Sequence, residues 1–187
     1  MAMTDSASAG PPPRRRRRGT GPLALLALAL VLAGCGFGGR GPPPPCPTAF
    51  PVAEARELTR FAGAGRDLTD VLFEARVQDV VLVCGYDDGV IEMDMRVWIV
   101  AVDGPANRGR KVRLAYFVAI ATLDRKIVAR EEFELEIPFE GNRTRVVAID
   151  EVSPRIPLRP GQTGADYVIY VGLALTPAEL RYNQENR

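Results

Sequence analysis

The sequence contains no histidine, three cysteines and a single tryptophan. Histidine is the commonest general base and the commonest zinc ligand in proteins, so its absence disfavours two large classes of enzyme. The motifs of activated serine or cysteine nucleophiles, and the phosphate-binding glycine loop with its lysine, are missing as well. We therefore expect a protein that is not an enzyme and that binds no metal or other cofactor.

Long apolar runs are equally scarce. The longest covers the 12 residues from Pro22 to Ala33, whereas a membrane-spanning helix needs about 20 apolar residues. Five arginines, Arg14 to Arg18, precede this run, and Leu32-Ala33-Gly34-Cys35 closes it. A positive segment, a short apolar segment and a cysteine after small residues follow one another in the order of a cleaved export signal.

In these three parts the N-terminus resembles the signal peptide of bacterial lipoproteins, with Leu32-Ala33-Gly34-Cys35 as the lipobox. The resemblance implies that residues 1–34 are removed and that Cys35 carries a diacylglyceryl group, which anchors the protein in a membrane of the cell envelope. Gly36 after the lipidated cysteine implies the periplasmic face of the outer membrane rather than the inner membrane. Two alternatives remain for the arginines, a nucleic-acid-binding tail and a twin-arginine signal.

The charge balance changes once this signal is removed. Removal takes away five of the 24 basic and one of the 23 acidic residues, which leaves 19 against 22 and a net charge of −3. A mildly acidic domain has no electrostatic reason to bind phosphate backbones or anionic headgroups. We therefore expect no nucleic-acid partner, and a membrane attachment that depends on the lipid of Cys35.

The segment 35–47 has the composition of a tether. Its core, Gly36 to Pro45, consists of glycines followed by prolines and cannot pack a hydrophobic core. It is either a spacer or a disordered segment of no particular length. The 140 residues 48–187 are enough for one domain with its own core and too few for two.

Cys46 and Cys84 are the two cysteines that remain when Cys35 carries lipid. In an oxidising periplasm such a pair usually closes, and we expect a disulfide between them. The alternative is a buried Cys84 that acts as a small apolar residue and a free, exposed Cys46.

Alternation of apolar and polar residues from Asp70 onwards predicts β-strands. Residues 71–77 and 91–99 follow this alternation and are expected to form the arms of a long hairpin, with a turn at residues 85–89. The run 80–84 is apolar at every position, which indicates either a β-bulge or a strand that is covered on both faces.

The rest of the chain continues the all-β pattern. Residues 112–120 predict a central strand, and residues 127–137 predict an edge strand with a solvated acidic row, Glu132, Glu134 and Glu136. The turn 158–161 with Tyr167 resembles the tyrosine corner of immunoglobulin-like domains. Thr176, Pro177 and Glu179 begin a short C-terminal helix. We expect an antiparallel β-sandwich of about seven strands, loosely similar to immunoglobulin or fibronectin domains.

One group of apolar side chains occupies positions that should face outwards: Trp98, Val100, Val102 and Phe117. Such a patch is either covered within the molecule or is a partner-binding surface. We expect a non-enzymatic accessory or assembly component that binds another envelope protein. The alternative is a small-molecule-binding or glycan-binding sandwich, with or without hydrolytic activity, whose site lies in end loops near Asp87 and Asp88.

Overall fold

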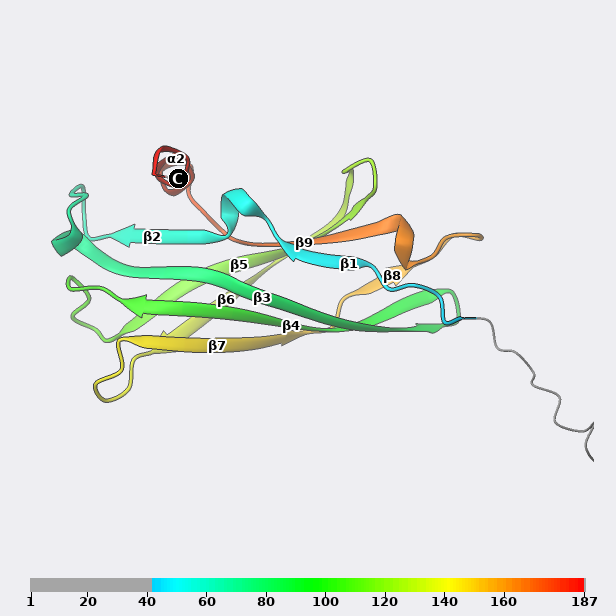
Figure 1. Ribbon diagram of the computed structural model, residues 1–187, viewed down its shortest axis with the longest axis horizontal. Helices are drawn as coiled ribbons and strands as arrows, with labels where there is room; N and C mark the ends of the chain where they lie inside the picture. Colours follow the sequence, from blue (N-terminus) through cyan, green and yellow to red (C-terminus); the bar gives the residue numbers. More distant parts are fainter. Residues whose placement is uncertain (1–41, 187) are drawn as a thin grey trace, which may run out of the picture. The chain divides into compact units, whose positions relative to one another are not determined.

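The computed structural model describes residues 42–186, within which the chain forms nine strands, three 3-10 helices and one α-helix (Figure 1). The predicted signal peptide, Cys35 and the tether as far as residue 41 lie outside the described residues. The strands are β1 (Thr48–Pro51), β2 (Glu57–Phe61), β3 (Val71–Asp87), β4 (Val90–Asp103), β5 (Lys111–Thr122), β6 (Ile127–Pro138), β7 (Arg145–Val152), β8 (Arg155–Pro157) and β9 (Tyr167–Leu173). The helices are η1 (Ala53–Ala55), η2 (Leu68–Asp70), η3 (Gly164–Asp166) and α2 (Pro177–Glu185).

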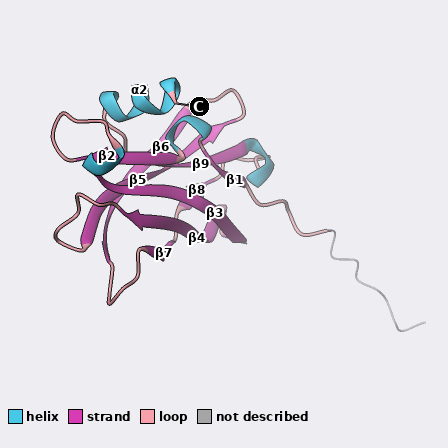
Figure 2. Ribbon diagram, turned by 60° about the vertical axis from the view of Figure 1, so that its left-hand side comes forward, coloured by secondary structure: helices cyan, strands magenta, loops and turns pink. Residues whose placement is uncertain are grey.

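The strands form two sheets that pack as a β-sandwich, as the alternation predicts (Figure 2). The first sheet has the order β1-β9-β5-β6, and the second has the order β2-β3-β4-β7, with β8 also paired to β4. All pairs are antiparallel except β1 with β9, which is parallel.

The nine strands within residues 42–186 exceed the expected seven. β1 and β2 precede Asp70, where the predicted strands begin, and β8 is a three-residue strand among prolines. In the sequence, Pro154, Pro157 and Pro160 predict an extended segment that does not pair. This prediction is wrong for residues 155–157, because prolines are compatible with an edge strand and β8 pairs with Glu92, Ile91 and Val90.

The core lies between the sheets and takes alternate side chains from both. Val77 and Ile99 of the second sheet, and Tyr116 and Ile169 of the first, have no exposed surface. The Tyr116 hydroxyl donates a hydrogen bond of 2.7 Å to Asp150 on β7. Burial, and then this hydrogen bond, raise the pKa of Tyr116 above its ordinary value.

The β3–β4 hairpin is the longest pairing in the described domain, and it resolves the question of residues 80–84. Val77 pairs with Ile99 and Asp79 pairs with Trp98, so Gln78 is an extra residue and forms a bulge. The bulge shifts the phase of β3, and as a result Val81 and Val83 point to solvent, 48% and 61% exposed. Asp88 and Gly89, with φ angles of 42° and 77°, make the tight hairpin turn.

The predicted central and edge strands are confirmed. β5 lies between β9 and β6, and β6 ends the first sheet with its acidic row exposed. The edge of β2 is bridged by α2, whose Asn183 side chain donates to the Glu57 carbonyl oxygen at 2.6 Å. The predicted start of α2 is also confirmed, because Thr176 and Glu179 form a reciprocal capping box.

The start of the domain is fastened to the β3–β4 hairpin. Cys46 and Cys84 lie at disulfide distance, with an S–S separation of 2.02 Å. The Tyr86 hydroxyl donates to the Pro45 carbonyl oxygen and accepts from the Gly164 N–H, both at 2.6 Å. The chain is therefore attached to the domain from Pro45 onwards, slightly before the expected boundary at residue 48.

The Tyr167 hydroxyl donates to the Gln162 side chain at 3.0 Å, whereas a tyrosine corner would bond to an upstream main-chain atom. Within residues 42–186, no helix is long and apolar enough to cross a bilayer.

Candidate interaction surface on the second sheet

The outward face of the second sheet collects apolar side chains from three adjacent strands. Val97, Ile99 and Ala101 of β4 point into the core, so the alternate residues Trp98, Val100 and Val102 point outwards together. Ile149 of β7 lies opposite Trp98, and Val147 lies opposite Val100. We call this surface the Trp98 face, and it consists of Val81, Val83, Trp98, Val100, Val102, Val147 and Ile149.

Several members of the Trp98 face remain accessible. Val147 and Ile149 are each 50% exposed, in addition to Val81 and Val83 on β3. Val100, between Arg76 and Val147, is only 5% exposed. Trp98 is half-buried, and its indole N–H is enclosed without an acceptor among the described residues.

Phe117 does not belong to this surface, so the expectation of one patch that includes it is wrong. It lies on β5, in the first sheet, and points away from the core residues Tyr116 and Val118. The Arg130 guanidinium lies 4.6 Å from its ring centroid. A Cβ atom built on Gly172 would lie 2.8 Å from the Phe117 ring and 2.8 Å from the Ala55 Cβ, which shows how closely η1 packs there. Strand alternation identifies outward positions but not the sheet to which each strand belongs.

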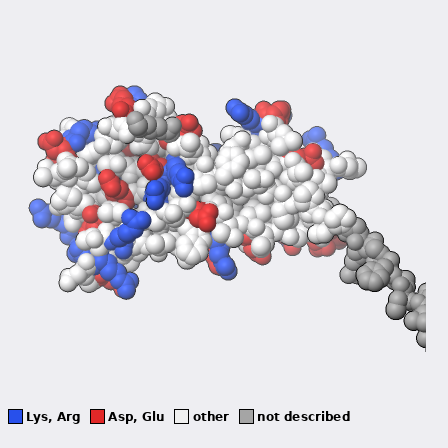
Figure 3. Space-filling model, in the orientation of Figure 1, with Lys and Arg blue, Asp and Glu red and all other residues white. Residues whose placement is uncertain are grey.

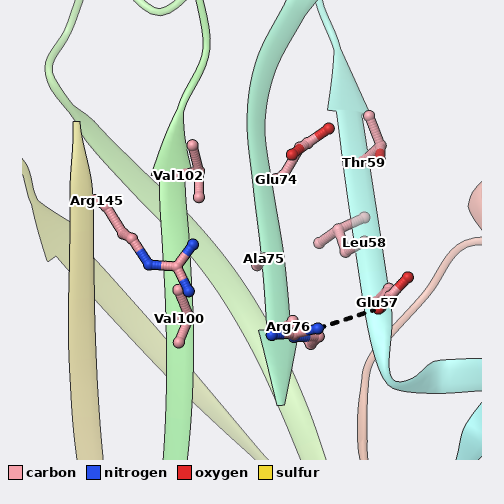
Figure 4. Close-up of a pocket in the computed structure, with 9 residues that line it drawn as sticks. All are labelled: Glu57, Leu58, Thr59, Glu74, Ala75, Arg76, Val100, Val102 and Arg145. Carbon is pink, nitrogen blue, oxygen red and sulfur yellow. Dashed lines mark ion pairs between the residues drawn. The ribbon is translucent and has the colours of Figure 1, made fainter. Parts of the chain in front are cut away.

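Charged side chains frame one end of the Trp98 face. Val100 and Val102 line a shallow hollow of about 290 Å³ whose charged rim is formed by Glu57, Glu74, Arg76 and Arg145. Figure 4 shows Arg145 extending from β7 across β4 towards Val100, and the Arg76–Glu57 ion pair of 3.9 Å on the opposite side. The Arg96–Glu151 ion pair of 2.7 Å lies towards the other end, in the row beyond Trp98 and Ile149. Both ion pairs are exposed, so they contribute little stability and can exchange partners.

The charges are distributed unevenly over the described domain. Figure 3 shows charged side chains gathered over the end that carries β2 and α2, and a largely uncharged surface over the part that carries β1 and β9. At the crowded end, Arg60 donates to Glu179 of α2 at 2.9 Å. Burial alone would raise the pKa of Glu179, but hydrogen bonds from Thr176 and Arg60 hold that pKa below its usual value.

The loop-end site expected near Asp87 and Asp88 coincides with none of five hollows on the described domain. Asp87 ends β3, and Asp88 lies in the β3–β4 turn. A hollow of about 570 Å³ instead opens at the side of the sandwich, between β6 and the β7–β8 segment, and its lining includes the core residues Val118 and Ile120 and the half-buried Phe133. No group of three or more acidic, cysteine or histidine side chains within residues 42–186 could hold a metal ion.

Four members of the Trp98 face were missed by sequence reasoning. Val81 and Val83 could not be placed on it without knowing the bulge. The sequence does indicate that Val147 and Ile149 share one face of a strand, because they are two residues apart in a short stretch of alternating side chains, 145–151. The alternation is short, and it does not indicate that β7 lies beside β4.

No model of a protein family matches the chain, and no curated protein and no solved structure matches it either.

Proposed function

We propose that this protein is a lipid-anchored envelope lipoprotein that faces the periplasm and works without catalysis, by binding another envelope protein through the Trp98 face. The observation that carries the proposal is the row of half-exposed valine and isoleucine side chains around Trp98. Contiguous apolar patches with a polar rim are typical of protein interfaces.

The anchor part of the proposal is supported by the lipobox and by the way the domain begins. Only ten residues, 36–45, separate Cys35 from Cys46. A fully extended chain of that length spans about 35 Å at most. A partner of this domain would therefore be found in or next to the same membrane.

The interface can be tested by substituting Trp98→Asp in the full chain and recovering crosslinked partners from intact cells. The matched control is Ile127→Asp, because Ile127 is 57% exposed on β6 of the first sheet. We expect both variants to fold, because neither side chain belongs to the core, and we expect recovery of the partner to fall at least tenfold for Trp98→Asp alone, a loss of hot-spot size. Equal recovery by the two variants, or the absence of any partner with the unsubstituted chain, would contradict the proposal.

The anchor is tested separately with Cys35→Ser. Without the thiol no lipid can be attached, so we expect the chain to lose its lipid label and to leave the detergent-soluble membrane fraction. A Cys35→Ser chain that still resists extraction by salt and high pH would show that lipid on Cys35 is not what holds it.

Ligand binding is the second candidate, and the hollow at the side of the sandwich is the observation that favours it. Its apolar wall includes Val118, Ile120 and Phe133. The charged lining residues are Arg130, Glu131, Glu151 and Arg155, which suits a small ligand with an apolar body and polar groups of either charge. Ala129→Trp should fill this hollow, because Ala129 is an exposed residue of its lining. Loss of a co-purifying small molecule in this variant, with partner recovery unchanged, would favour this candidate over the first.

A further inference from the structure

Within residues 42–186, no strand pairs with the outer edge of β7, the last strand of the second sheet. The sheet order ends at β7, and β8 lies farther along the same edge of β4. Beyond the two ends of β7, the Asp103 N–H donates to the Thr144 carbonyl and the Met93 N–H donates to the Pro154 carbonyl, in an unbroken register. Main-chain bonding alternates along an antiparallel strand, so the even-numbered residues from 144 to 154 bond to β4. The N–H and C=O groups of the odd-numbered residues therefore point to the open edge, and these residues are Arg145, Val147, Ile149 and Glu151.

The side chains of these same four residues form a self-complementary series. They all lie on the outward face, with a positive charge at one end, two apolar residues in the middle and a negative charge at the other end. A second β7 placed antiparallel about Ala148 would bring Arg145 opposite the partner's Glu151 and Val147 opposite the partner's Ile149. The Arg145 side chain has no ion-pair partner within residues 42–186.

We propose that the protein forms a two-fold symmetric dimer in which β7 pairs antiparallel with β7 of a second copy, centred on Ala148. The second sheet then continues through both copies, and each of the four outward residues exchanges both main-chain hydrogen bonds with the residue opposite. The Trp98 faces of the two copies join along Val147 and Ile149. This dimer requires neither the lipid nor another envelope protein, so it stands independently of the proposed function.

The charge pattern selects this register among the alternatives. A shift by one residue would turn the apolar side chains to the wrong face. A shift by two residues that centres the pair on Ile149 would place Val147 opposite the partner's Glu151. Asp150 does not oppose the pairing, because its carboxylate points inwards and accepts the Tyr116 hydrogen bond.

The open edge of the first sheet, at β6, is less suited than β7 to pairing with a second copy of itself. β6 carries Glu132, Glu134 and Glu136 on its outward face, and antiparallel self-pairing centred near them brings glutamates opposite one another. Like charges directly opposite destabilise strand pairing. Of these two edges, only β7 is complementary to itself.

The first test is Ala148→Cys in the full chain, treated with a mild oxidant in intact cells and run on a non-reducing gel. Ala148 and the partner's Ala148 would form a non-hydrogen-bonded pair with Cα atoms about 4.5 Å apart, within the range of a disulfide. The matched control is Ala129→Cys, the same substitution on β6. We expect a covalent dimer with Ala148→Cys only, and an equal yield from the two variants would overturn the proposal.

The second test addresses the charges in the Ala148→Cys background. Arg145→Glu places like charges at both ends of the pair, as does Glu151→Arg, and each should lower the dimer yield about tenfold. When the two charge variants are expressed together with different tags, both ends of a mixed dimer bring opposite charges together, so the mixed dimer should recover the original yield. Unchanged yields in the single variants, or no recovery in the mixture, would overturn the proposed register.

A third test uses exposed positions, so that folding is not in question. Val147 faces the partner's Ile149 as a hydrogen-bonded pair, with Cα atoms about 5.5 Å apart. Val147→Cys and Ile149→Cys chains should therefore crosslink when mixed, and neither should crosslink alone. Crosslinking of either variant by itself to the level of the mixture would show a different arrangement and would overturn the proposal.

Discussion

The two outer faces of the sandwich carry similar apolar side chains, but they differ in what covers them. On the first sheet, Phe117 lies beneath Arg130 and beside Ala55 of η1. On the second sheet, Val147 and Ile149 remain half exposed. Strand periodicity therefore decides which side chains point outwards, whereas the connecting segments decide which of these side chains stay accessible.

The cover on the first sheet follows from the unusual position of β1. Its parallel pairing with β9 brings the following helix η1 over β9, close to Gly172. α2 then packs against η1 and β2, and Tyr182 makes an edge-to-face contact with Phe61. Among the described residues, no corresponding helix packs on the Trp98 face.

The two faces should differ most in the free energy of unfolding that is lost when an apolar side chain is truncated to alanine. Phe117→Ala should lower the free energy of unfolding by about 3 kcal/mol because it leaves a cavity beneath η1 and Arg130. Val147→Ala on the other face should cost less than about 1 kcal/mol. Urea denaturation followed by the fluorescence of Trp98, the single tryptophan, measures both, and equal losses would remove the distinction between the faces.

Two glycines give a matched test of the space above each sheet. Gly172→Ala would force a Cβ atom against Phe117 and Ala55, and should destabilise the domain by about 1–3 kcal/mol. Gly85 on β3 has no atom within 4 Å of the corresponding position. Gly85→Ala should therefore be neutral, or stabilising by up to about 1 kcal/mol. Thermal unfolding of the two variants compares them directly, and a loss of stability with Gly85→Ala would contradict an open second face.

The fastening of α2 should depend on pH. Because the pKa of Glu179 is lowered in the folded state, its contribution to stability is present above the ordinary glutamate value of about 4.3 and is lost as the pH falls through the folded-state pKa. We expect amide hydrogens of α2 to exchange faster below that pH, after correction for intrinsic rates. Glu179→Gln should abolish this pH dependence, and an unchanged profile in that variant would show that another group is responsible.

The smallest effect is expected at Val83, which is 61% exposed on the Trp98 face. Val83→Thr keeps a β-branched side chain and should change the free energy of unfolding by less than about 0.5 kcal/mol. A loss above 1 kcal/mol in urea denaturation would indicate that this face is covered after all.

Much of the fold could be predicted where the signal was local. The strands at residues 71–77 and 91–99 and the capping box of Thr176 each depend on neighbours in the chain, and each is confirmed. The turn expected at residues 85–89 is also present, although β3 continues to Asp87 and only Asp88 and Gly89 make the turn. The pairing of Cys46 with Cys84 could be predicted because few cysteines were available.

What could not be predicted depends on contacts between distant segments. Nothing in Thr48–Pro51 indicates parallel pairing with β9, and nothing in Phe117 indicates that β5 belongs to the other sheet from β4. Val147 and Ile149 were missed for the same reason, because the neighbour of β7 is set by the packing of the whole sandwich. The candidate surface was therefore predicted only along β4.

The attachment of Cys46 to Cys84 has a mechanical consequence for a chain held at its N-terminal side. Tension that arrives at Cys46 would pass through a covalent bond into β3, a 17-residue strand between β2 and β4. The four-residue strand β1, which follows Cys46 and pairs with β9, would be relieved of that load. The force would act as shear along the β3–β4 hairpin, where many hydrogen bonds must break together, instead of peeling the first sheet one bond at a time.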